Sequence, residues 1–60
     1  MKNRQFNIDD IVLVDNQFIC KVIWSAMDNG EWWYGVRPTQ FEGIDREVTA
    51  DRLEKWEVAR

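Results

Sequence analysis

The sequence predicts an all-β domain, a small barrel of five short strands with one helical turn near residues 49–53. Three observations lead to this prediction. β-branched and aromatic residues, which fit the pleated surface of a sheet, fill short runs that are separated by turn residues. Asn29-Gly30 is a strong hairpin signal, because both residues tolerate the positive φ angles of a tight turn. The 60 residues leave room for one domain only, and closing its sheet would protect the strand edges from aggregation.

The first strand is expected within residues 6–15, FNIDDIVLVD, because β-branched residues dominate from Ile11 to Val14. Residues 1–5 precede this strand as a short polar lead that we expect to be frayed. Asp15–Gln17 form a turn, because Asp and Asn side chains bond to their own backbone in such positions.

Two strands on either side of Asn29-Gly30 are expected to pair as a hairpin. In residues 18–25, the two-residue period of a strand places on one face Cys20, Val22 and Trp24. In residues 31–38, EWWYGVRP, the same period puts Trp32, Tyr34 and Val36 on one face, which we expect to be the core side. The opposite face of that strand collects Trp33, Gly35 and Arg37. Pro38 ends the strand or makes it an edge, because proline donates no backbone hydrogen bond.

The C-terminal third begins with a polar loop, TQFEGIDRE, in which Gly43 is the flexible point. A fourth strand follows in residues 46–50, and a helical turn in 49–53 that Thr49 would cap through its side-chain oxygen. Residues 53–58 complete the fold as a fifth strand. The alternative is one helix over residues 45–60, where several residues favour helices but the apolar ones do not keep a helical spacing.

Composition excludes several classes of function. Cys20 is the one cysteine and there is no histidine, so we expect no disulfide framework, no metal site, no cofactor and no activated nucleophile. No apolar run approaches the roughly 20 residues that span a bilayer, and the N-terminus does not resemble a signal peptide, so we expect a cytoplasmic protein. The net charge of −3, with basic residues interleaved among acidic ones, disfavours nucleic acid as the partner.

The order of these signals resembles the SH3-like barrel superfamily in its Tudor and KOW-like forms. The resemblance covers residues 6–58 and is carried by IDDIVLV, CKVIW, WYGVR and VTADRL, with Asp9 where the family commonly has glycine. It implies an SH3-like barrel. In Tudor-type domains it also implies a cage of aromatic rings for methylated lysine or arginine, for which the candidates here are Trp24, Trp33, Tyr34 and Phe41. Type II dihydrofolate reductases share this barrel and carry an active-site signature, VQIY. The matching strand reads EVTA here, so we do not expect an enzyme.

The aromatic run predicts a small non-catalytic interaction module that binds a protein or peptide, or a second copy of itself, through an exposed aromatic face. Exposed aromatic residues and arginine are enriched at contact sites, so the predicted partner-binding residues are Trp33, Arg37, Phe41, Trp24 and Tyr34. The alternative for Trp33 is that the 39–46 loop covers its ring. Two other functions remain open: an accessory nucleic-acid-binding protein, and an enzyme whose site forms only on oligomerisation.

Overall fold

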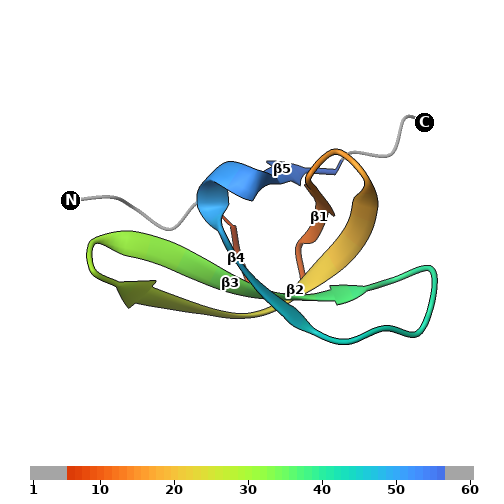
Figure 1. The fold of residues 1–60 in the computed structure, drawn as a ribbon, viewed down its shortest axis with the longest axis horizontal. Helices are drawn as coiled ribbons and strands as arrows, with labels where there is room; N and C mark the ends of the chain where they lie inside the picture. The colour runs from red at the N-terminus through yellow and green to blue at the C-terminus, as the bar shows by residue number, and fades with distance from the viewer. Residues whose placement is uncertain (1–5, 57–60) are drawn as a thin grey trace.

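In a computed structural model, which describes residues 6–56, five antiparallel strands form one sheet in the order β4-β3-β2-β1-β5 (Figure 1). The elements are β1 (Ile11–Val14), β2 (Phe18–Asp28), β3 (Glu31–Pro38), β4 (Arg46–Thr49), the 3-10 turn η1 (Ala50–Arg52) and β5 (Leu53–Lys55). The predicted all-β class, the five strands and the helical turn are confirmed. The expected fraying of residues 1–5 and the end of the predicted fifth strand lie outside the described residues. Within 6–56, no helix has the length and apolarity to span a bilayer.

The sheet curls without closing into the expected barrel. Among the described residues, β4 pairs only with β3 and β5 pairs only with β1, so these two edges do not meet through a strand ladder. Between them η1 makes a single helical turn, which delivers the chain to β1 instead of folding it back onto β4. Figure 1 shows the resulting shape, in which the β2–β3 hairpin extends away from the curled part of the sheet.

The core lies on the concave side of this curl. Its buried residues are all apolar or aromatic: Phe6, Val12, Val14, Cys20, Val22, Tyr34, Val36, Val48 and Leu53. Tyr34 is fully buried at the centre, with the Phe6 ring edge-on at 5.4 Å and the Trp32 ring stacked at 6.4 Å between centroids. The predicted core face of residues 31–38 is therefore confirmed, since Trp32 also packs against the core.

The predicted face of the second strand is wrong from Trp24 onward. Val22 pairs with Val36, but Trp24 pairs with Gly35, so the register shifts and Ile23 is the extra residue of a β-bulge. One inserted residue reverses the side on which all later side chains of the strand lie. Trp24 therefore leaves the side of Cys20 and Val22 and lies on the convex side, across from Gly35.

The predicted turns are confirmed by their backbone angles. Asn29 and Gly30 have φ angles of 50° and 77°, as a tight hairpin with two left-handed residues requires. Asp15 and Asn16 are left-handed as well, at 52° and 57°. Asp9, which stands where the resembled family has glycine, adopts φ 77°, a conformation that Asp tolerates better than most residues.

Two details at the C-terminal end differ from expectation. Thr49 stands at the N-cap position of η1, but its side chain donates to the Asp51 carboxylate and caps no backbone amide. The carboxylate of Asp51, two residues further on, is therefore the partner of the Thr49 hydroxyl in place of a backbone amide of the turn. A large ring just after the last strand of a closed barrel would be expected to fill the barrel end, but Trp56 is 38% exposed, because the sheet has no closed end.

Two ion pairs fix the connections between strands: Arg52 of η1 holds Asp15 of the β1–β2 turn, and Arg37 of β3 holds Asp45 of the following loop. The Arg52 guanidinium donates to both Asp15 carboxylate oxygens, with 2.9 Å between Nε and Oδ1, and this hydrogen bonding holds the pKa of Asp15 below 3.8. Arg37 does the same for Asp45, at 2.9 Å and 3.0 Å, and lowers the pKa of that carboxyl too. Both pairs are exposed, so each contributes modestly and is screened by salt.

These lowered pKa values predict an acid-sensitive contribution to stability. A carboxyl whose pKa is lower in the folded chain stabilises the fold above its unfolded value, here 3.8, and that stabilisation is lost as the pH falls through the folded pKa. We expect the melting temperature to drop on acidification below about pH 4, and Arg52→Gln to remove part of that drop. Circular dichroism melts across this range measure both effects.

Lys55→Gln is the matched control, because it removes one positive charge from an exposed residue of β5 that is not part of either pair. If Arg52→Gln and Lys55→Gln change the acid dependence equally, the effect comes from net charge and not from the Arg52–Asp15 pair.

Candidate partner-binding site

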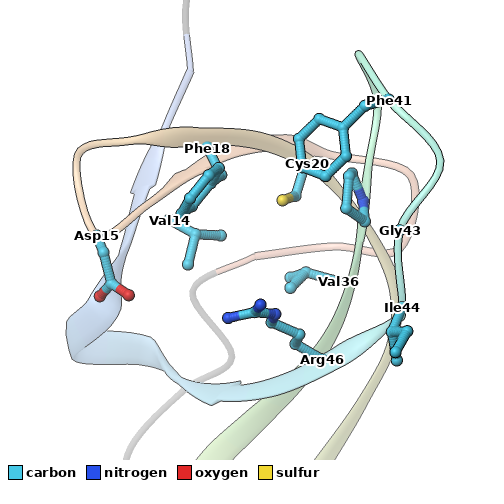
Figure 2. Close-up of a pocket in the computed structure, with 10 residues that line it drawn as sticks. Val14, Asp15, Phe18, Cys20, Val36, Phe41, Gly43, Ile44 and Arg46 are labelled. Atoms are coloured by element: carbon cyan, nitrogen blue, oxygen red, sulfur yellow. The ribbon is translucent and has the colours of Figure 1, made fainter.

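An apolar pocket of about 300 Å³ opens where the end of β1, the start of β2, the end of β3 and the start of β4 come together. Its apolar wall consists of Val14, Phe18, Cys20, Val36, Pro38 and Phe41. Figure 2 shows Val14, Phe18, Val36 and Phe41 arranged around the opening, with the Cys20 sulfur directed into it. We call this cavity the apolar pocket.

Local sequence explains how the apolar pocket forms. Pro38 pairs with Cys20 and ends β3, and Thr39 then fixes the chain by donating its backbone N–H and its hydroxyl to the Ile19 carbonyl, both at 3.1 Å. The loop that follows folds back so that the Phe41 ring meets the Phe18 ring edge-on, 6.2 Å between centroids. Gly43 permits this path, because a Cβ there would lie only 3.0 Å from the Phe41 ring.

The mouth of the apolar pocket carries large exposed hydrophobic side chains. Phe18 is 40% exposed, Phe41 55% and Ile44 86%. Scattered exposed apolar residues are normal, but several around one concave opening are typical of a contact site.

The polar groups at the mouth are Arg46 and the carboxylate of Asp15, which Arg52 already holds. Cys20 at the floor is 4% exposed, and burial raises the pKa of its thiol, although the Arg46 charge partly opposes this. A buried thiol with a raised pKa is a poor nucleophile. The apolar pocket is therefore suited to binding an apolar group and not to thiol catalysis.

A second depression, of about 310 Å³, lies on the convex side of the β2–β3 hairpin. Its lining residues are Trp24, Ala26, Asp28, Trp33 and Glu47. The Trp24 indole covers Gly35, so the open space that glycine would leave beside Trp33 is filled. Trp24 and Trp33 are both half-buried. Two indoles beside two carboxylates suit a cationic group, since ring faces and carboxylates both attract positive charge.

The predicted partner-binding residues therefore do not form one surface. Trp24 and Trp33 meet in the convex depression, and Arg37 lies on the same side of β3 but is held by Asp45. Phe41 belongs to the apolar pocket. Tyr34 is fully buried, so both its ring and its hydroxyl are removed from any contact surface.

Sequence reasoning missed three residues at the apolar pocket: Phe18, Ile44 and Arg46. Phe18 lies two residues before Cys20, so the two-residue period of a strand places both side chains on the same face. This spacing could have predicted an inward-facing ring at the start of β2. Arg46 lies two residues before buried Val48, so the same period places it on the concave side of β4. The sequence could therefore have predicted an arginine on that side. Ile44 lies in the loop and carries no periodic signal.

Among the described residues, no cluster of acidic or cysteine side chains has the arrangement of a metal site. Comparison of the chain with protein-family models, curated proteins and solved structures gives no match, so function has to be inferred from the geometry of these two sites.

Proposed function

We propose that the chain is a small SH3-like interaction module, without catalytic activity, that binds a protein or peptide partner. The order of short strands, the Asn29-Gly30 hairpin and the helical turn before the last strand support the resemblance to this superfamily. The free, buried thiol of Cys20 agrees with a reducing compartment, and we place the protein in the cytoplasm on that ground.

The observation that carries this proposal is the apolar pocket with its exposed rings. Phe18 and Phe41 expose apolar surface at the mouth of a cavity that would otherwise hold water against apolar walls. When an apolar side chain of a partner enters the cavity, its own surface and the cavity wall are both removed from water. Each Å² of apolar surface buried in this way contributes about 25 cal/mol to the binding free energy. Aromatic anchors around such cavities commonly dominate the binding energy of an interface.

We expect Phe41→Ala to reduce partner binding at least tenfold, because the ring forms one wall of the apolar pocket, while the melting temperature changes little. The measurement is quantitative affinity capture from the native lysate with tagged wild-type and variant proteins, followed by binding assays with the captured partner. Sedimentation velocity at increasing concentration tests whether the partner is a second copy of the chain.

Ile8→Ala provides the matched control. Ile8 is 52% exposed, close to the 55% of Phe41, and does not line the apolar pocket. Equal binding losses for the two variants would mean that the contact surface is not centred on the apolar pocket.

The two other functions remain less favoured proposals. For nucleic acid, stacking on Trp24 and Trp33 would bring phosphates close to the carboxylates of Asp28 and Glu47, which repel them. For an oligomeric enzyme, the raised pKa of the Cys20 thiol removes a nucleophile, so chemistry would need groups from a second copy.

A further inference from the structure

Within residues 6–56, Arg46 differs from the other two arginines because it forms no ion pair with a carboxylate. Arg37 and Arg52 each bind an aspartate through two hydrogen bonds, whereas among residues 6–56 no acidic group lies within ion-pair distance of Arg46. Arg46 lies at the start of β4 and pairs with Val36 of β3. The Val36 side chain faces the core, and residues that pair directly across two strands project from the same face of the sheet. The Arg46 guanidinium is thereby brought to the concave side, at the mouth of the apolar pocket.

The charge of Arg46 acts on the interior of the apolar pocket. Figure 2 shows the guanidinium directed across the opening toward the side where Asp15 lies. The pKa of Asp15 is lowered first by the hydrogen bond from Arg52, and also by the Arg46 charge. Because Asp15 is already neutralised by Arg52, the mouth has one positive charge in excess beside an apolar cavity.

A matching ligand carries an anion directly beside an apolar group. The cavity, at about 300 Å³, is at the small end of ligand sites and suits one side chain. A C-terminal residue presents its side chain and its carboxylate from the same carbon atom, so both reach the apolar pocket together. A guanidinium binds a carboxylate through two parallel hydrogen bonds, as Arg37 and Arg52 already do in this chain.

The edge of the sheet favours a peptide over a free carboxylic acid. Arg46 begins β4, and in the described sheet β4 pairs with β3 alone. The second edge of β4 can therefore receive the backbone of an extended peptide, a common mode of peptide recognition. A free acid has no backbone to use this edge.

We propose that the apolar pocket binds the C-terminus of a partner peptide, with the last side chain, an apolar one, in the cavity and the terminal carboxylate on Arg46. This inference depends on the proposed partner-binding function and specifies its ligand. Phe18 and Phe41 enclose the side chain, and Arg46 selects a free carboxylate over an amide or a continuing chain.

The test uses the full chain labelled with ¹⁵N and two pairs of peptides, acetyl-Gly-Gly-Leu and acetyl-Gly-Gly-Phe, each as the free acid and as the C-terminal amide. Chemical-shift titration of the Cys20, Phe41 and Arg46 amides gives the affinities, and slower alkylation of Cys20 reports that the cavity is filled. We expect each acid to bind at least about tenfold more tightly than the corresponding amide. Arg46→Gln should abolish that difference by weakening acid binding to the level of amide binding.

Lys55→Gln is the control, because it removes the same charge from an exposed residue that does not line the apolar pocket. The preference for the acid should survive it. Equal binding of acid and amide to wild-type protein would overturn the inference while leaving partner binding at the apolar pocket intact. That comparison needs no variant, so it stands even if Arg46→Gln fails to fold.

Two further outcomes are decisive. If octanoate shifts the same amides and the peptide acids do not, the ligand is a free carboxylic acid and the peptide assignment is wrong. If none of these probes shifts the pocket amides at millimolar concentration, the inference is overturned. In that case, retained binding of the captured partner by Phe41→Ala would show that the proposed function at the apolar pocket fails as well.

Discussion

Tyr34→Ala is expected to leave the domain unfolded at room temperature. Tyr34 is fully buried, and its ring contacts both Phe6 and Trp32. Removing a buried aromatic ring costs about 3–5 kcal/mol. A domain of 60 residues has roughly 3–9 kcal/mol of total stability, at about 0.05–0.15 kcal/mol per residue. The loss of one ring is therefore comparable with the whole free energy of unfolding.

Urea denaturation followed by tryptophan fluorescence measures this effect. Tyr34→Phe is the control, because it keeps the ring and removes only the hydroxyl, which accepts a hydrogen bond from the Phe6 backbone at 3.4 Å. We expect that variant to lose about 0.5–1.5 kcal/mol. If Tyr34→Ala retained most of the wild-type stability, the core would have to be centred elsewhere.

The parts of the fold that the sequence predicts correctly are those encoded by neighbouring residues. Asn29-Gly30 specifies its hairpin through its own φ angles. The two-residue period of residues 31–38 separates buried Tyr34 and Val36 from the convex side. Both signals are complete within a few residues, so no knowledge of the partner strand is needed to interpret them.

The bulge at Ile23 could not be predicted in this way. Nothing in the sequence around Ile23 marks an extra residue, because a bulge exists only relative to the register of a second strand. Its effect on the site is large. It moves Trp24 to the convex side, where the two-residue period had not placed it, so that Trp24 and Trp33 line one depression.

The apolar pocket also depends on contacts between distant residues. Phe41 could be suspected because it is a ring in a polar loop, but its partner Phe18 lies on another strand and meets it only after the loop folds back. The open sheet has the same origin. Strand count and turn signals do not specify whether β4 and β5 pair, since that depends on the direction in which η1 sends the chain.

Gly35→Ala is expected to destabilise the domain by about 1–3 kcal/mol, which is large for the addition of one methyl group. A Cβ at position 35 would overlap the Trp24 indole at Nε1, Cε2 and Cδ1. The indole would have to leave its place over the strand and expose apolar surface. Thermal and urea denaturation of wild type and variant measure the loss.

A double-mutant cycle with Trp24→Ala separates this clash from any other effect at Gly35. Gly35 has no positive φ, so alanine there brings no backbone strain and lowers the entropy of the unfolded chain. In the Trp24→Ala background, Gly35→Ala should therefore be neutral or stabilising, by about 0.4–1 kcal/mol. The sign of the effect thus reverses when the indole is removed. The same cost in both backgrounds would mean that the Trp24 ring does not cover Gly35, and the bulge that places it there would be wrong.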